Sequence, residues 1–346
     1  RNVIYGLAVT GCAMALTVST RIGAVAAEDT IVIGNTSIID TVDPVHNGSN
    51  AWSLTADGVS ETVFMKDKDG NLVSRFVDSI EQKDDLTWEI KLKSGVKFSD
   101  GTDVDAQAFC DSMNSIMQNN EMASSSAGMI TFTATDDATV TLTTERETTV
   151  MPSVLCEYNM VVCKDNGDSS YVFTGPYVID SMDPGVELDL VPNEYYDDRA
   201  ADRSNVVIKG FSDAATMQQA FESGEIDMAF TVTPETAGIL QGEGYTTKDF
   251  DAGYQYFMVV NSKENETLSD LKLRQAINVG INREDMVTAL KGGRVANGFF
   301  AQYYSFAGDV QETYDPEQAK YLLEEAGYTD TDGDGFVDKD GEKLTL

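Results

Sequence analysis

Segments with two different hydrophobic periods alternate along the chain and predict strands and helices in turn. Residues 30–35 form a short apolar run that is typical of a buried strand. Over residues 88–93 apolar and charged side chains alternate with a period of two, as expected for a strand with one face in water. The same patterns predict further strands at residues 130–134, 139–143, 173–179, 186–191, 226–230 and 256–260.

Helix signals are clearest where a capping residue precedes apolar side chains spaced three or four apart. Asp105 is such a cap, and the helix that it starts is predicted to run to about Gln118. Asp315 and Pro316 open a helix that Gly327 ends, with proline at the first helical position and glycine beyond the last. Further helices are predicted after Asp213, Asp270 and Asn282. The chain is therefore a mixed α/β protein with more than one lobe.

The charge balance excludes several classes of protein. Among 346 residues, 58 are Asp or Glu and 24 are Lys or Arg, which gives a formal net charge of -34. Such a chain lacks the basic groups that release counterions from nucleic acid, so nucleic acid is not an expected partner. With 42% hydrophobic residues, it is neither disordered, nor a collagen, nor a multi-span membrane protein.

Residues 1–27 have the layout of a secretory signal peptide. An apolar run at residues 3–18 follows Arg1, and small residues at 23–27 precede the polar start at Glu28. In a second interpretation residues 9–12 are a lipobox that anchors the protein through a lipidated Cys12, although the apolar run continues past that position. In both cases the protein is exported, to the periplasm or to the outer face of the cell membrane.

Cysteine and histidine leave little room for metal or nucleophile chemistry. Signal-peptide cleavage would leave Cys110, Cys156 and Cys163, an odd number that cannot form a complete disulfide framework. Cys156 and Cys163 either pair across a bend or remain buried free thiols. His46 is the single histidine, so a zinc site is a poor prospect and every Ser-His or Cys-His pair would need this residue. It follows an Asp-Pro turn and is interpreted as a solvated loop residue, while catalysis by carboxylates alone stays open.

Several ordered motifs carry a family resemblance. The longest is the stretch from Leu86 to Thr102, and a Thr-Gly-Pro-Tyr turn follows at 174–177. The other motifs lie at residues 43–44, 106–112, 220–227, 270–277 and 315–328. Together, from about Thr30 to the last residue, the chain resembles the family 5 extracellular solute-binding proteins, the peptide and nickel receptors of ABC importers.

The resemblance implies an α/β fold that is two-lobed and periplasmic-binding-protein-like, with an extra subdomain on the first lobe. By analogy, lobe I comprises residues 28–43 and 166–250, its subdomain residues 44–165, and lobe II residues 251–346. Family members are longer, so lobe II is expected to be incomplete and the chain to be C-terminally truncated. In peptide-binding relatives a later acidic residue holds the amino terminus of the ligand, so residues 28–346 alone are expected to bind peptide weakly or not at all.

A peptide cleft needs aromatic platforms and polar groups that resemble the backbone. The candidate ligand-binding residues are Trp52, Tyr158, Asn159, Tyr177, Tyr254 and Tyr256. The resemblance places Trp52 at a cleft-lining position and Tyr158 with Asn159 in a segment that approaches the cleft. Tyr254 and Tyr256 are alternate residues of a predicted strand, which share one face. Each residue has a structural alternative, which is packing on the subdomain or in a core, and packing is favoured for Tyr177.

An acidic loop offers separate chemistry. Asp330, Asp332, Asp334 and Asp338 stand at positions 1, 3, 5 and 9 of a calcium-loop pattern, with glycine at position 6. Position 12 should be Glu and is Gly341. The alternative is a solvated Asp-Gly turn without a metal. Apart from this calcium, no cofactor is expected.

The sequence therefore predicts a receptor and not an enzyme. We expect a monomer that captures an oligopeptide or dipeptide ligand between two lobes and delivers it to an ABC permease complex in the membrane. Nickel chelates and oligosaccharides remain alternative ligands. A secreted calcium-dependent hydrolase is the alternative from another class, and only the acidic loop and the surplus of carboxylates support it.

Overall fold

The computed structural model describes residues 30–67, 70–249, 255–265, 267–300, 304, 306–308, 310 and 313–345. The chain divides into two compact units, Arg1–Thr231 and Val232–Leu346. This boundary precedes the one predicted between the lobes, and the assignment of lobes and subdomain stays a prediction. Among the described residues, no helix has the length and apolar character needed to cross a membrane. The predicted signal peptide and Cys12 lie outside the described residues.

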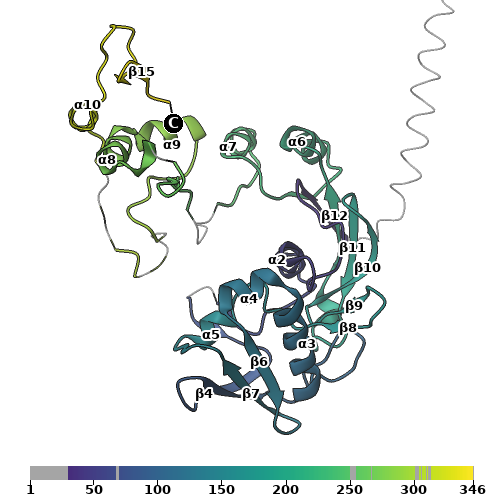
Figure 1. Cartoon of the computed structure of the whole chain (residues 1–346). Coiled ribbons are helices and arrows are strands. Elements are labelled where there is room, and N and C mark those ends of the chain that lie inside the picture. The colour runs from purple at the N-terminus through teal and green to yellow at the C-terminus, as the bar shows by residue number, and fades with distance from the viewer. Residues whose placement is uncertain are drawn as a thin grey trace, which may run out of the picture. The chain divides into compact units, whose positions relative to one another are not determined.

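The first unit contains a five-stranded sheet with the order β10-β11-β12-β1-β13 (Figure 1). Its strands are β1 (Thr30–Asn35), β10 (Tyr177–Asp183), β11 (Glu187–Pro192), β12 (Asn205–Gly210) and β13 (Met228–Ala229). β1 pairs in parallel with β12 and β13, whereas β11 is antiparallel to β10 and β12. Helix α6 (Ala214–Glu222), which Asp213 caps, packs on β1. Gly34 allows this contact, because a Cβ there would lie 3.0 Å from Met217 Cγ of α6.

A four-stranded antiparallel sheet in the same unit has the order β4-β5-β7-β6. Its strands are β4 (Val77–Gln82), β5 (Thr87–Leu92), β6 (Ile130–Ala134) and β7 (Thr139–Thr144). Helix α3 (Ala106–Asn119) packs on β6 and β7 and buries Phe109, Met113 and Ile116 (Figure 1). The Asp105 carboxylate caps it by accepting from the Ala108 N–H at 2.8 Å. The predicted cap, helix and alternating strand are all confirmed.

Shorter elements connect the two sheets. They are α2 (Gly48–Ala56), β2 (Met65–Lys66), β3 (Leu72–Val73), α4 (Glu121–Ala127), α5 (Met151–Val154), β8 (Lys164–Asp165), β9 (Tyr171–Val172) and the 3-10 helix η1 (Ala200–Asp202). A single cluster of buried apolar residues runs from Ile90 and Phe109 at one sheet to Leu188 and Ile208 at the other. The first unit therefore has one continuous core.

A buried polar network crosses this core. Arg75 Nε donates to Glu61 Oε2 at 2.7 Å, and Arg75 Nη2 donates to the Thr174 carbonyl at 2.6 Å. The Tyr196 hydroxyl donates to Glu61 Oε1 at 2.8 Å. Burial raises the pKa of Glu61, and the Arg75 charge opposes that shift. The network joins the segment after α2 to the residues that lead into β10.

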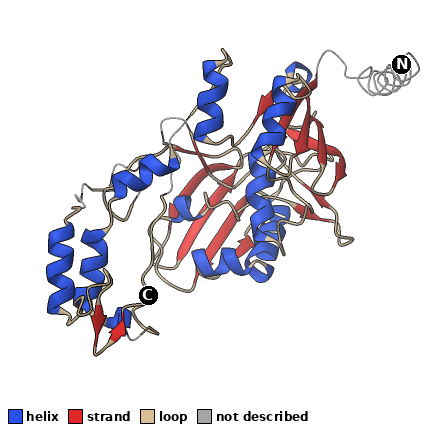
Figure 2. Ribbon diagram, turned by 90° about the horizontal axis from the view of Figure 1, so that it is seen from above, coloured by secondary structure: helices blue, strands red, loops and turns tan. Residues whose placement is uncertain are grey.

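The described regular structure of the second unit is mostly helical, with a short hairpin near its end (Figure 2). Its elements are α7 (Pro234–Gly242), the 3-10 helix η2 (Thr267–Ser269), α8 (Leu271–Gly280), α9 (Arg283–Leu290), α10 (Pro316–Glu325), β14 (Asp338–Lys339) and β15 (Glu342–Lys343). α8 packs on α10 over a small core of Leu273, Ala326 and Tyr328. The four helices predicted after Asp213, Asp270, Asn282 and Asp315 are confirmed.

Three strand predictions need correction. The described residues 255–260 form no strand, so the prediction at 256–260 is wrong. The strand predicted at 173–179 is shifted, because Gly175 N–H bonds to the Val59 carbonyl before β10 begins. The strand predicted at 226–230 is shortened to Met228–Ala229, although the flanking N–H groups of Asp227 and Phe230 also bond to β1, at the Val32 and Gly34 carbonyls. In each case hydrogen bonding to a distant segment decides the outcome.

Candidate functional site

Two of the predicted site residues, Trp52 and Tyr158, lie on elements that flank a methionine that sequence reasoning missed. Trp52 of α2 and Met122 of α4 are 56% and 50% exposed. The Tyr158 hydroxyl lies 4.0 Å from Met122 Sδ, and α2 packs against α4 (Figure 1). We call the side chains of Trp52, Met122 and Tyr158 the Trp52 surface. Nothing in the local sequence marks Met122, because its role depends on the packing of two helices.

Gly48 allows α2 and α4 to approach closely. A Cβ at this position would lie 2.9 Å from Met122 Sδ and 3.1 Å from Asn120 Oδ1. Asn120 caps α4 by accepting from Met122 N and Ala123 N at 3.0 and 3.1 Å. Side chains on a helix lean toward its N-terminus, and Trp52 is one turn beyond Gly48. The indole of Trp52 therefore covers the side of α2 on which Met122 lies.

Asn159, which directly follows Tyr158 in the sequence, is buried. Its side chain is 3% exposed, and its Oδ1 accepts no hydrogen bond among the described residues. An unsatisfied buried acceptor costs about 1–3 kcal/mol and calls for an explanation. Because this oxygen is itself buried, a molecule on the Trp52 surface does not reach it in this structure. The binding roles of Trp52, Tyr158 and Asn159 stay predictions.

Tyr177 has the packing environment that the sequence favours. It is the first residue of β10, and its Cδ2 would lie 3.3 Å from a Cβ on Gly58, whose φ is +74°. With Val59 and Tyr171 it lines a mainly apolar cavity of about 200 Å³. A binding role for Tyr177 remains a prediction.

The remaining aromatic candidates belong to the second unit. Tyr254 lies outside the described residues. Tyr256 is 89% exposed in a segment without regular structure. Its neighbour Phe257 contacts Phe299 at a ring-centroid distance of 5.5 Å. Tyr256 is therefore not part of a strand, and the position of Tyr254 relative to it stays a prediction.

The acidic loop brings the carboxylates of Asp330, Asp332 and Asp338 within 4.8 Å of one another. Asp334, the fourth predicted ligand, instead pairs with Lys343. Asp330 accepts from the N–H groups of Gly333 and Gly335 at 2.7 and 3.0 Å, so the loop uses its carboxylates to fix its own turn. These contacts favour the solvated Asp-Gly turn, and calcium binding at this loop stays an untested hypothesis of the sequence.

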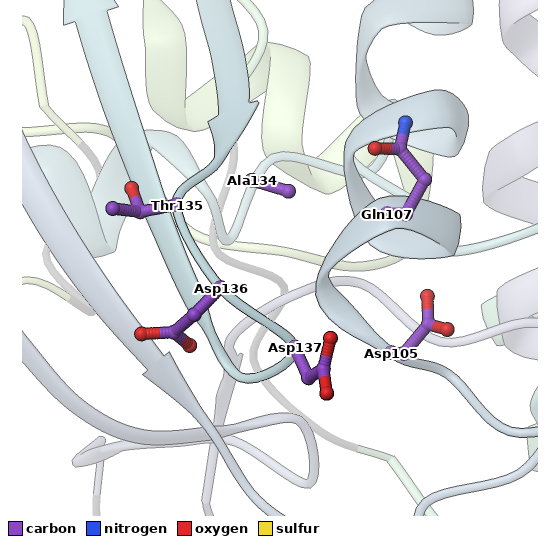
Figure 3. A pocket seen from close by; sticks show the side chains of 6 residues that line it. All are labelled: Asp105, Gln107, Ala134, Thr135, Asp136 and Asp137. Carbon is purple, nitrogen blue, oxygen red and sulfur yellow. The ribbon is translucent and has the colours of Figure 1, made fainter.

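A second acidic hollow, of about 230 Å³, lies between the start of α3 and the β6–β7 turn (Figure 3). Asp105 and Asp136 line it, but both carboxylates already accept backbone N–H groups, from Ala108 and Ala138. Asp137 and Gln107 also line the hollow. The two carboxylates therefore have structural roles.

Histidine and cysteine show no arrangement for nucleophilic catalysis among the described residues. His46 is exposed, and its Nδ1 lies 2.9 Å from Asp43 Oδ2, as expected of a loop residue. Cys110, Cys156 and Cys163 are free, so Cys156 and Cys163 are not paired. Burial raises the pKa of Cys110 and of Cys163 to about 12, which keeps both thiols protonated at neutral pH.

Comparison with known proteins decides the family. The profile of the bacterial extracellular solute-binding proteins, family 5 (middle), matches residues 71–346. The chain belongs to this family. Family 5 is a family of binding proteins, which agrees with a surface built for contact rather than for nucleophilic catalysis.

Two family 5 relatives illustrate the similarity in sequence. The glutathione-binding protein GsiB of Escherichia coli O157:H7 is 25% identical over 350 residues, covering 93% of this chain and 65% of the relative. The nickel-binding periplasmic protein of Escherichia coli K12 is 25% identical over 312 residues, covering 83% of this chain and 59% of the relative. The chain thus spans less than two thirds of the length of these relatives.

Solved structures show the family 5 fold. NikA from Brucella suis in complex with Fe(III)-EDTA matches with a TM-score of 0.79 and 21% identity, over 91% of this chain and 68% of that one. The oligopeptide-binding protein AppA from Bacillus subtilis, in complex with a nonapeptide, matches with a TM-score of 0.66 and 21% identity, over 91% of this chain and 67% of that one. The predicted two-lobed, periplasmic-binding-protein-like α/β fold is confirmed.

Proposed function

We propose that the protein is the exported substrate-binding receptor of an ABC importer, with oligopeptides or dipeptides as its ligands. It binds its ligand without turnover and passes it to a membrane permease complex. Membership of family 5 supports the class of function. The observation that carries the ligand class is the exposed Trp52 surface.

A peptide suits this surface for physical reasons. The exposed ring of Trp52 offers contact area that does not depend on one particular side chain, as a binder of variable sequences needs. AppA, one of the structural neighbours, is described as oligopeptide-binding.

Nickel chelates are the second candidate, because a nickel-binding periplasmic protein is among the relatives. A chelate would also use an aromatic platform, but the free thiols of the first unit are protonated and do not favour a bare metal ion. A chelate would therefore have to bring its own ligands.

The test is to incubate the mature full-length protein, rather than residues 28–346 alone, with a pool of di- to hexapeptides, a nickel–histidine complex and an oligosaccharide mixture. Native mass spectrometry then identifies the retained species, and the supernatant is analysed for cleavage products. We expect unaltered peptides on the protein, and weaker retention by a Trp52→Ala variant. Retention of the nickel complex alone would favour the second candidate, whereas catalytic cleavage of peptides would contradict a receptor function.

A further inference from the structure

The Trp52 surface has the properties of a site for a cation. The faces of Trp52 and Tyr158 carry the negative lobe of the ring quadrupole, which attracts ammonium and guanidinium groups. Met122 adds a polarisable thioether 4.0 Å from the Tyr158 hydroxyl. An exposed tryptophan beside an exposed methionine is therefore more than apolar contact area, because both side chains favour a positive charge.

Carboxylates accompany two of the three side chains. Glu121 directly precedes Met122, and Glu157 directly precedes Tyr158, and both are exposed. The net charge of -34 adds a negative potential that extends over a Debye length. This field raises the local concentration of cations and lowers that of anions.

The basic residue Lys66 lies near this region. Lys66 of β2 acts on the partly buried Cys156 thiol, and its charge opposes the rise in pKa that burial causes. The Phe64 N–H bonds to the Leu155 carbonyl at 3.1 Å, which fixes β2 beside the 155–158 segment. The charge of Lys66 therefore weakens the preference of the Trp52 surface for a cation. Replacing Lys66 should strengthen this preference, whereas replacing Glu157 should weaken it.

We propose that the Trp52 surface selects ligands that carry an ammonium or guanidinium group, so that the preferred peptides contain lysine or arginine. This inference rests on the proposed function and deepens it, because it names the chemistry of the preferred ligand. Trp52 and Tyr158 hold the cation against their ring faces, beside the thioether of Met122. Glu121 and Glu157 act through the field.

Tryptophan fluorescence can follow this site directly. The chain has two tryptophans, and Trp88 is buried with its Nε1 bonded to the Thr148 carbonyl at 3.0 Å. In a Trp88→Phe background of the mature protein, the emission comes from Trp52 alone. Titrations compare N-terminally acetylated Gly-Lys-Gly with the same peptide acetylated on the lysine side chain as well, which is similar in shape and carries no ammonium group.

We expect the lysine peptide to bind about tenfold more tightly than its lysine-acetylated form, as a partly desolvated cation–π contact allows. Trp52→Leu, followed by calorimetry, should reduce this ratio to near one. Tyr195→Leu, at another exposed aromatic residue of the first unit, should leave it unchanged. Glu157→Gln should lower the ratio and Lys66→Gln should raise it. A melting temperature for each variant shows that it is folded.

The outcomes separate this inference from the proposed function. Equal affinity for the two peptides would overturn the cation preference and leave a peptide receptor in place. Binding of neither peptide, nor of any peptide in the mixed pool, would overturn both. A preference for lysine that survives Trp52→Leu would show that the cation is recognised elsewhere, which also contradicts the proposal.

Discussion

The two units bury their apolar side chains to different extents. In the first unit one core connects two sheets, from Ile90 and Phe109 to Leu188 and Ile208. The second unit has a small core around Leu273, while Phe299 is 71% exposed in a row of contacting rings. This row comprises Phe257, Phe299, Phe300, Tyr304 and Phe306.

This difference indicates where the molecule is rigid. The Trp52 surface lies on elements that the large core holds in place, so its geometry is set before a ligand arrives. The second unit buries less per residue and is expected to open at a lower cost in free energy. A large exposed apolar area also marks a surface that contacts something else.

The largest expected effect is a loss of stability that distinguishes the core of the first unit from the core of the second. Phe109→Ala should lower the free energy of unfolding of the first unit by about 3–5 kcal/mol, because it removes a fully buried ring and leaves a cavity. Urea unfolding followed by tryptophan fluorescence measures it, since both tryptophans are in the first unit. Leu273→Ala is the matched change in the second unit and should leave this transition unmoved. If Leu273→Ala shifts it as strongly, the two units unfold as one and the comparison fails.

The buried ion pair should give the next effect. Arg75→Met leaves the Glu61 carboxylate buried without its cation and should cost about 3 kcal/mol at pH 7.5. Burial already raises the pKa of Glu61, and losing Arg75 raises it further. The folded state then binds a proton that the unfolded state releases, so the loss grows as the pH rises through the folded pKa and shrinks in acid. Urea unfolding at several pH values checks this.

The control is the double variant in which Glu61→Gln accompanies Arg75→Met. It removes the stranded charge, so it should be more stable than Arg75→Met alone at neutral pH. If the double variant is the less stable of the two, the cost of Arg75→Met does not come from the buried carboxylate.

Local signals account for the part of this fold that the sequence predicts well. Asp105 and the apolar spacing of α3, or Pro316 and Gly327 around α10, act within one turn of the chain and carry their own physical cause. The segment at 256–260 has an equally clear apolar pattern, yet it forms no strand. A strand exists only when another segment accepts and donates its hydrogen bonds, and that condition is not local.

The candidate site also contains residues that local sequence signals predict and residues whose role depends on tertiary packing. The type and place of Trp52 and Tyr158 could be predicted, whereas Met122 could not. Its contact with Tyr158 depends on Gly48 letting α2 approach α4, and on Asn120 bonding to the Pro44 carbonyl at 3.2 Å. The sequence also does not predict that Asn159 Oδ1 is buried and accepts no hydrogen bond among the described residues, because both properties depend on the tertiary fold.

A smaller effect is expected at Asp57, the residue that follows α2. Burial raises the pKa of Asp57 to about 6, and the negative end of the helix adds to the cost of its charge. Stability should therefore fall between about pH 4 and pH 6 as this group ionises. Asp57→Asn should raise the free energy of unfolding by about 2 kcal/mol at pH 7.5 and leave it unchanged below pH 3.5. Melting curves at the two pH values would show this difference. Asp78→Asn, at an exposed position of β4, should leave the free energy of unfolding unchanged at both pH values. An equal gain in stability from Asp78→Asn would show that burial is not the cause.

The smallest effect concerns the acidic loop of the second unit. We expect millimolar Ca²⁺ to leave the melting temperature unchanged, because Asp334 is paired with Lys343 and Asp330 bonds to the turn. A rise that is lost in a variant with Asp332→Ala and Asp338→Ala would instead establish a calcium site by mass action. Mg²⁺ at the same concentration controls for ionic strength.

Hydrogen exchange with and without ligand tests the central claim most directly, which is that the first unit carries a preformed ligand surface. The mature protein is exchanged alone and with saturating lysine-containing peptide, and protection is read by mass spectrometry. The account predicts added protection at the start of α2, at the start of α4 and over residues 156–160, with little change in the core strands β5 and β7. Added protection confined to other parts of the first unit, with these three segments unchanged, would contradict it.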